Sequence, residues 1–183
     1  MKIGLIIPAN MKYSPYIQYY IQNFENKGIK YVTIVWNKRN LNENANFTFE
    51  YSCEDYDRKK IFIGHYKFAK KCKKIIKKEN IDKFIIFTIA PAFFLGIRYL
   101  KKYDNKFILD IRDDSPFRRK FPKEFKKICS MAFSVVVSSS NFTLWTGRKT
   151  VLCHNADINT IKNFYNTETH KNIYKPISIV FAG

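Results

Sequence analysis

The sequence of 183 residues is poor in acidic side chains: 15 Asp and Glu stand against 33 Lys and Arg, which gives a formal net charge of +18. Glycine and proline are also scarce, with six of each, which excludes collagen-like and low-complexity classes. The four cysteines show no CxxC spacing and are too few for a disulfide scaffold, so neither a zinc ribbon nor a secreted disulfide-rich fold is indicated. The apolar content of 46% is sufficient for one packed domain and excludes a disordered chain.

Long apolar runs are absent as well. Residues 84–97 carry no charge, but this stretch is interrupted by Pro91 and is shorter than the roughly 20 apolar residues that span a membrane. Residues 128–147 are also uncharged, but they are rich in Ser and Thr. An apolar strand pattern begins directly after Lys2, so we expect no signal peptide. These features predict a cytoplasmic protein.

Periodic patterns predict alternating strands and helices. Short apolar runs predict strands at residues 2–8, 31–36, 46–52, 83–89, 106–111, 133–137, 150–153 and 177–181. Helical spacing predicts helices at residues 15–27, 67–79, 91–103, from Pro122 onward and at 141–146. Ser14 and Ser138–Ser140 precede two of these helices and are expected to cap them. Strands that alternate with helices predict an α/β fold, a Rossmann-like doubly wound parallel sheet with right-handed crossovers.

The excess positive charge is concentrated in the middle of the chain. Residues 61–130 hold 19 basic and 7 acidic side chains, an excess of 12 out of the total of 18. At 100° per residue, the apolar residues of 67–79 fall within one arc of about 120° and the lysines lie opposite. We expect the following cations to face an anionic membrane, at about 1 kcal/mol each: Lys70, Lys71, Lys74, Lys77, Lys78, Arg118, Arg119 and Lys120.

Two other interpretations of this basic surface remain open: a merely solvated face and a nucleic-acid interface. The aromatic residues recur at core positions and do not alternate with the lysines, as stacking platforms for bases would. This arrangement argues against nucleic acid as a partner.

Candidate site residues follow the predicted strands, because ligands of such sheets bind at the carboxyl ends of the strands. The densest polar cluster is 110–116, Asp-Ile-Arg-Asp-Asp-Ser-Pro. One of its carboxylates can accept the proton of a hydroxyl nucleophile while Arg112 orients a substrate group. The first strand lacks GxGxxG, which argues against NAD binding by that route. The three histidines are too scattered for a metal site, and Asp113 with Asp114 alone seldom holds magnesium, so no metal is predicted.

The order of motifs resembles the N-terminal, acceptor-side domain of family 4-type glycosyltransferases with the GT-B architecture. The motifs are FIIFTIAPAFFLGIRYL (84–100), FILDIRDDSP (107–116), AFSVVVSSSNF (132–142), TVLCHNAD (150–157) and ISIVFAG (177–183), after an opening strand and a helix that ends at Gly28. His154 and Ala156 stand where the family usually has Pro and Gly, and Arg112 stands where many relatives have His.

The resemblance implies a retaining glycosyltransferase that uses a nucleotide sugar and needs no metal or other cofactor in this domain. It implies Asp113 as the catalytic residue and Arg112 as a substrate clamp. The substrate-binding candidates are Asn10, Lys12, Arg112, Asp114, Ser139 and Asn155.

The resemblance also divides the chain. Residues 1–157 correspond to the acceptor-side domain, 158–176 to an interdomain linker, and 177–183 to the first strand of a donor-binding domain. The resemblance implies that the rest of that domain is missing, and we expect the sequence to be a fragment, the product of an interrupted gene or one half of a two-chain enzyme. We therefore expect this chain to be inactive alone.

The expected role is the synthesis of bacterial capsule or lipopolysaccharide, with a glycan or lipid-linked acceptor and a peripheral position at the inner face of the membrane. The alternatives are a non-catalytic basic protein that docks on membranes or partners, and a nucleic-acid-binding domain.

Overall fold

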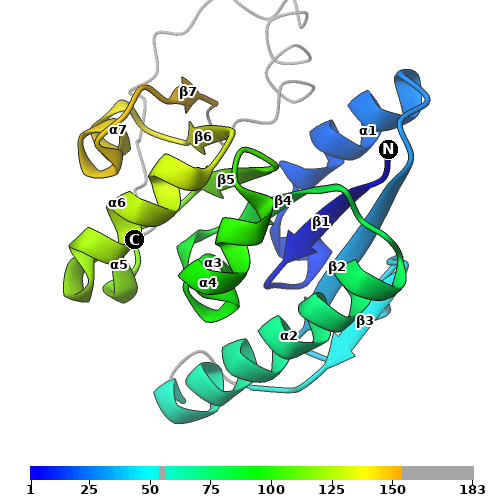
Figure 1. The fold of residues 1–183 in the computed structure, drawn as a ribbon. Helices are drawn as coiled ribbons and strands as arrows, with labels where there is room; N and C mark the ends of the chain where they lie inside the picture. The colour runs from blue at the N-terminus through cyan, green and yellow to red at the C-terminus, as the bar shows by residue number, and fades with distance from the viewer. Residues whose placement is uncertain (54–56, 154–183) are drawn as a thin grey trace, which may run out of the picture.

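A seven-stranded sheet forms the centre of the molecule in the computed structural model, which describes residues 1–53 and 57–153 (Figure 1). The strands are β1 (Ile3–Ile7), β2 (Tyr31–Asn37), β3 (Phe47–Glu50), β4 (Lys83–Phe87), β5 (Phe107–Ile111), β6 (Ser134–Val137) and β7 (Val151–Leu152). All neighbouring strands are parallel, in the order β3-β2-β1-β4-β5-β6-β7. The predicted doubly wound parallel sheet is confirmed.

Helices connect the strands on both faces of this sheet. They are η1 (Met11–Tyr13), α1 (Ile17–Asn26), α2 (Arg58–Lys78), α3 (Ile89–Leu95), α4 (Ile97–Leu100), η2 (Lys101–Tyr103), α5 (Pro116–Lys120), α6 (Pro122–Met131) and α7 (Ser140–Thr146). The connection from β1 to β2 runs toward one edge of the sheet and the connections from β3 onward run toward the other. Right-handed crossovers therefore put α1 on one face and α2 to α7 on the opposite face.

Two hydrophobic cores result, one under each layer of helices. Side chains alternate across the sheet, so neighbouring residues of a strand enter different cores. In β1, Leu5 and Ile7 pack under α1, whereas Ile6 packs on the side of α2. This double burial explains why the central strands have continuous apolar sequences.

The helix expected at 67–79 is longer than predicted and begins at Arg58. The carboxylate of Asp57 accepts a hydrogen bond from the backbone N–H of Lys60 at 2.9 Å and so caps its first turn. The sequence analysis missed the first half of this helix because residues 58–60 (Arg-Lys-Lys) and Gly64 interrupt its apolar periodicity.

The helix expected at 91–103 is not one continuous helix. It begins at Ile89 and breaks at Gly96, whose φ of +83° a helix cannot contain. A short helix that the sequence analysis did not predict, α5, begins at Pro116, and the hydroxyl of Ser115 accepts from the N–H of Phe117 at 3.3 Å.

Neither of the two predicted serine caps makes a side-chain capping bond. Ser139 occupies the position before α7, but it accepts from Phe142 N–H through its backbone carbonyl and its side chain makes no capping bond. Ser14 ends η1, and α1 has regular helical bonds only from Ile17, without a side-chain cap. The predicted linker 158–176 and the strand 177–183 lie outside the described residues.

Candidate functional site

The polar residues of the 110–116 segment lie at the carboxyl edge of the sheet, where β5 ends. Asp110 is in the strand, and Arg112, Asp113 and Asp114 follow it. The neighbouring strand β6 is fastened to this segment, because Ser138 Oγ donates a hydrogen bond to the carbonyl oxygen of Arg112 at 2.7 Å. The structure thus places the cluster at the edge where parallel α/β sheets bind their ligands.

Asp110 and Arg112 form a buried bidentate ion pair. Arg112 Nε lies 2.5 Å from Asp110 Oδ1, and Arg112 Nη2 donates to Asp110 Oδ2 at 2.6 Å. Arg112 Nη1 donates to the carbonyl oxygen of Cys153 at 2.9 Å, which ties the end of β7 to β5. Arg112 is only 2% exposed, and it remains charged because its bond to Asp110 outweighs the burial and raises its pKa. Three of its contacts are therefore internal and hold the edge of the site together.

Two tyrosines of the first helical region complete this buried network. Tyr20 Oη donates to Asp110 Oδ2 at 2.6 Å, and the guanidinium of Arg112 lies 4.4 Å from the ring centre of Tyr16. Burial, and next the charge of Asp110, raises the pKa of Tyr20 far above its ordinary value, so its hydroxyl stays protonated. The sequence analysis missed both tyrosines, because their helical spacing is that of an ordinary apolar face.

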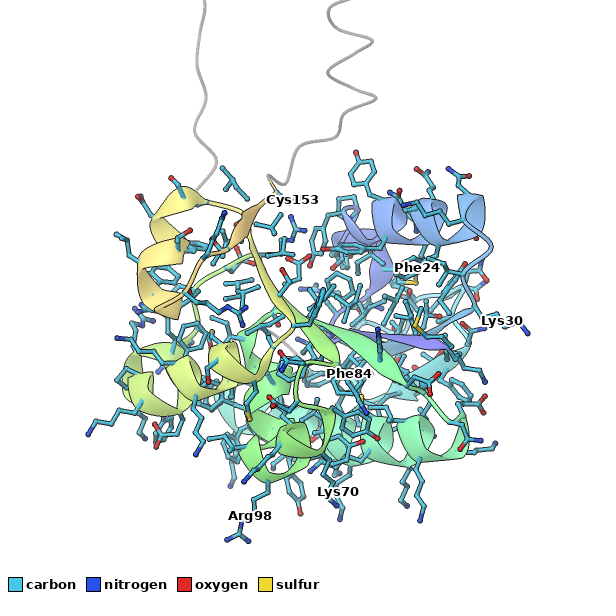
Figure 2. The ribbon with its side chains drawn as sticks, turned by 45° about the horizontal axis from the view of Figure 1, so that its top comes forward. Phe24, Lys30, Lys70, Phe84, Arg98 and Cys153 are labelled. Atoms are coloured by element: carbon cyan, nitrogen blue, oxygen red, sulfur yellow. The ribbon has the colours of Figure 1, made fainter. Side chains whose placement is uncertain are left out.

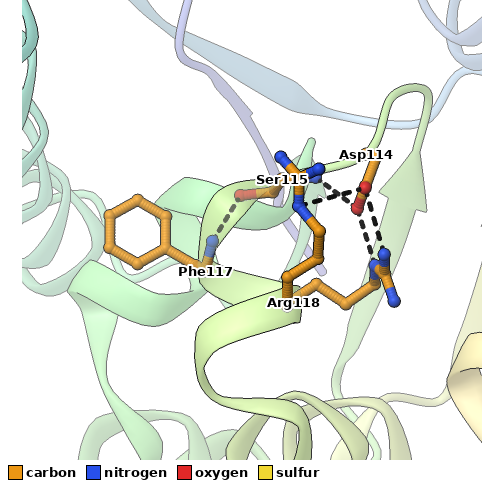
Figure 3. Close-up of polar contacts among 5 residues, drawn as sticks. Asp114, Ser115, Phe117 and Arg118 are labelled. Carbon is orange, nitrogen blue, oxygen red and sulfur yellow. Dashed lines mark hydrogen bonds and ion pairs between the residues drawn. The ribbon is translucent and has the colours of Figure 1, made fainter.

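Asp114 is paired with two arginines of α5 (Figure 3). Arg118 binds it with two N–H groups at 2.6 and 3.0 Å, and Arg119 Nε lies 3.6 Å away. The bond to Arg118 lowers the pKa of Asp114. Two of the cations predicted to face a membrane are thus partly neutralised within the chain, and Asp114 acts as an anchor for α5.

Asp113 differs from its neighbours because it is exposed. Within residues 1–53 and 57–153 no donor or cation pairs with its carboxylate. It projects from the same edge as the buried Asp110–Arg112 pair. A free carboxylate on a rigid support is available to accept a proton from a bound hydroxyl group.

The other predicted substrate-binding residues are distributed along the same edge. Asn10 is buried: its amide donates to Asn37 and Glu43, and its oxygen accepts from the N–H of Lys38. These bonds join the ends of β1 and β2, so Asn10 supports the edge from within. Lys12 is exposed on η1.

Ser139 is partly exposed at the start of α7, next to the segment that carries Arg112. The prediction for Asn155 lies outside the described residues.

Backbone strain marks the end of the neighbouring strand β4. Thr88 has φ +65° and ψ 168°, a region that is almost restricted to glycine, and its N–H donates to the carbonyl oxygen of Asp110 at 2.8 Å. A β-branched residue in this conformation costs about 1–3 kcal/mol. The strain lies at the candidate site, between β5 and the start of α3.

A groove between α2 and α5 opens beside this site, and we name it the α2–α5 groove. It has a volume of about 570 Å³. Its walls are mainly apolar, and the cations Arg58 and Arg119 also line it. The lining residues are Arg58, Ile61, Phe62, His65, Ala90, Ser115, Pro116, Phe117 and Arg119. It suits an apolar group that carries a negative charge at one end.

His65 lies at the inner end of the α2–α5 groove. Its ring stacks on Phe94 and meets Trp36 edge-on, with centroid distances of 5.3 and 5.0 Å. Burial, assisted by Lys38, lowers its pKa to about 3, so the imidazole is neutral at pH 7. Its Nδ1 is buried and has no hydrogen-bond partner in the described part of the chain.

The lysine face of α2 is exposed as predicted: Lys70, Lys71, Lys74, Lys77 and Lys78 all point to solvent. Figure 2 shows Lys70 projecting from the side of the molecule away from Cys153. Among the described residues, no helix has the length and apolarity to cross a membrane. The same residues include no cluster of three or more His, Cys, Asp or Glu side chains that would hold a metal ion.

Comparison with known structures supports the fold. No protein-family model matches the sequence, and no curated protein matches it. The UDP-GlcNAc 2-epimerase from Methanocaldococcus jannaschii matches with a TM-score of 0.50 and 16% identity, over 81% of this chain and 43% of the epimerase. An alpha-glucosyltransferase, solved with UDP and a DNA 13-mer, matches with a TM-score of 0.54 and 13% identity, over 90% of this chain and 44% of that enzyme.

These likenesses define the class of fold. The chain has the α/β architecture of one half of GT-B-type proteins, and it spans less than half the length of the two structures described above. In its fold, the molecule therefore resembles one half of each of these two structures.

Proposed function

We propose that this chain is the acceptor-binding half of a retaining, nucleotide-sugar-dependent glycosyltransferase that acts in bacterial surface polysaccharide synthesis. The observation that carries the proposal is the position of Asp113, an exposed carboxylate with no partner among the described residues, at the carboxyl edge of the sheet beside the α2–α5 groove. The fold class is consistent with it, because both structural matches are enzymes of nucleotide sugars or carry a UDP ligand.

In this proposal the residues have distinct tasks. Asp113 accepts the proton of the acceptor hydroxyl group as the acceptor oxygen bonds to the anomeric carbon of the sugar, while the bond from that carbon to the phosphate oxygen breaks and the nucleotide leaves. The buried pair of Asp110 and Arg112 holds the edge rigid next to Asp113. The donor nucleotide sugar is bound by a second unit that faces this edge, and no metal is required in this half.

The acceptor is a glycan carried on an anionic lipid at the inner face of the membrane. Its apolar part occupies the α2–α5 groove and its acidic group lies between Arg58 and Arg119. The lysine face of α2 lies against the anionic membrane surface, and each cation contributes about 1 kcal/mol to the binding free energy. The exposed aromatic residues Phe62 and Tyr66 on the same helix suit the interface between water and lipid.

Vesicle binding tests the membrane part of the proposal. The full chain should float with vesicles that contain anionic lipid and stay behind with neutral vesicles. Replacing Lys70, Lys74 and Lys77 together by Gln should weaken binding about 100-fold, because three cations contribute about 3 kcal/mol. The matched control replaces Lys27, Lys30 and Lys106, exposed lysines outside α2, and should change binding much less.

Two results would count against this assignment. Equal binding to neutral and anionic vesicles would contradict the proposed electrostatic contact with the membrane. Alternatively, the chain could bind duplex DNA tightly, with a steep salt dependence, and not bind vesicles. This result would favour the nucleic-acid interpretation, in line with the DNA in one matched complex.

A further inference from the structure

The face of the sheet that carries α1 is only partly covered. In the part of the chain that the structure describes, α1 is the one α-helix on this face, and it packs mainly on β1, β2 and β4. The strands β5, β6 and β7 extend beyond it, as Figure 1 shows. All-parallel sheets occur almost exclusively with both faces covered, so this open strip is unusual.

The open strip forms a continuous apolar groove along α1, which we name the α1 groove. Two hollows of about 240 and 410 Å³ make it up, and they share Tyr20 and Phe24. Ile108 of β5 and Val136 of β6 form part of the floor. Three further apolar side chains along it are exposed, Met1 by 69%, Phe133 by 67% and Val151 by 54%.

The rim of the α1 groove is positively charged. Lys27, Lys83 and Lys106 line the two hollows and are exposed, and no carboxylate among the described residues lines either hollow. The length of the groove is set by five-residue strands, roughly 17 Å at 3.3 Å per residue. A helix of about 11 residues has this length.

We propose that the α1 groove binds an amphipathic helix of a partner protein, with one apolar face and acidic residues along its edges. A helix is the element that covers parallel sheets, and its acidic edges would pair with the lysines of the rim. A second copy of this chain carries the same charge of +18 and is repelled.

The segment 154–183 of the chain has three lysines and two acidic residues, so its charge does not complement the rim either. The partner is therefore an acidic polypeptide. This inference does not depend on the proposed glycosyltransferase function, because it concerns the binding of a polypeptide and requires neither a sugar donor nor an acceptor.

A labelled full-length chain tests the proposal directly. Cys153 is exposed and lines the α1 groove, whereas Cys53, Cys72 and Cys129 are buried, so an environment-sensitive fluorophore can be attached there selectively. The probe is a designed 14-residue amphipathic peptide with leucines on one face and glutamates along both edges. The matched peptide has lysines in place of the glutamates.

The glutamate peptide should shift the fluorescence and bind at least ten-fold more tightly than the lysine peptide. The double variant Phe133→Ser, Val151→Ser should weaken binding at least ten-fold, and both side chains are exposed enough for the fold to persist. Lys27→Gln with Lys106→Gln should weaken it about five-fold. The control Tyr66→Ser with Lys70→Gln, on the opposite side of the sheet, should leave it unchanged.

Several outcomes would overturn the proposal. Equal affinity for both peptides, or an affinity that the groove variants do not change, would show that the contact is non-specific. A chain that dimerises at micromolar concentration, and loses the dimer with Phe133→Ser, would assign the groove to a second copy. Binding that appears only after cleavage of residues 154–183 would assign it to the chain's own C-terminal segment.

Discussion

His65 is a buried titratable residue that is surrounded by aromatic rings. It is 8% exposed and lies between Trp36 and Phe94, and its pKa is lowered to about 3. In the unfolded chain a histidine has a pKa near 6.5. Between these two values the unfolded state binds a proton that the folded state does not, so acidification favours unfolding.

The expected result is a loss of stability as the pH falls below about 6.5, at up to about 1.4 kcal/mol per pH unit from this residue. The loss should end near pH 3, where the folded state also binds the proton. His65→Phe keeps an aromatic ring between Trp36 and Phe94 but removes the titration. Urea unfolding at pH 7 and pH 4.5 should show a difference between wild type and variant that changes by about 2–3 kcal/mol.

Carboxylates elsewhere titrate in both proteins and therefore cancel in this difference. A difference that stays constant over the same pH interval would mean that His65 is solvated or protonated in the folded state.

The sequence identified the residues of the candidate site better than their partners. Arg112, Asp113 and Asp114 lie together at the carboxyl edge of β5, where the strand pattern predicted them. Sequence neighbours nevertheless have different environments: Asp110 and Arg112 bind each other, Asp114 binds α5, and Asp113 has no partner within the part of the chain that the structure describes. A pattern of residue types does not reveal this division, because it depends on contacts with residues up to 90 positions away, such as Tyr20.

At the scale of the element, α2 depends on the absence of a side chain at Gly64. A Cβ atom at this position would lie 2.2 Å from Cζ2 of Trp36, a buried side chain that cannot move away. The indole N–H of Trp36 also donates to the carbonyl oxygen of Tyr51 at 2.8 Å, which fixes the ring further. Gly64 therefore permits α2 to approach β2 closely, despite the low helix propensity of glycine.

Gly64→Ala should destabilise the protein by about 1–3 kcal/mol, the usual cost of overpacking, although alanine has the higher helix propensity. Because the clash is with Trp36, its fluorescence should change as well, and Trp145→Phe in the background removes the second tryptophan. Lys71→Ala, at an exposed position of the same helix, is the control and should be neutral or slightly stabilising. A Gly64→Ala variant as stable as the wild type would contradict the close packing of α2 on Trp36.

The elements themselves were predictable where the pattern was long and regular. The apolar patterns predicted all seven strands of the described sheet, and their alternation with helices predicted the parallel pairing. The first half of α2 and the break at Gly96 were missed because capping by Asp57 and a positive φ are local effects of single residues. The helix α5 was missed because five residues are too few for a periodic signal.

At the scale of the whole molecule, the described residues form a sheet whose ligand edge carries a free carboxylate. The chain spans 43% and 44% of the two enzymes that it matches in structure. In our proposal, an acceptor hydroxyl held at Asp113 receives its sugar from a donor that a second unit supplies. Catalysis in our proposal is a property of the assembled pair, and each half alone should be inactive.

The final prediction concerns this assembled enzyme. This chain mixed with, or fused to, a nucleotide-sugar-binding half should transfer sugar to a lipid-linked acceptor, whereas the chain alone should not. Asp113→Asn should lower kcat by at least about 100-fold, because loss of a general base typically costs 10²- to 10⁴-fold. Its thermal unfolding should be unchanged, since Asp113 is exposed and contributes no ion pair among the described residues. Asp104→Asn, an exposed aspartate at the C-terminal end of η2, is the matched control and should retain full turnover. If Asp113→Asn turns over as fast as the wild type, the proton is accepted elsewhere, and the exposed carboxylate at this edge has no part in the reaction.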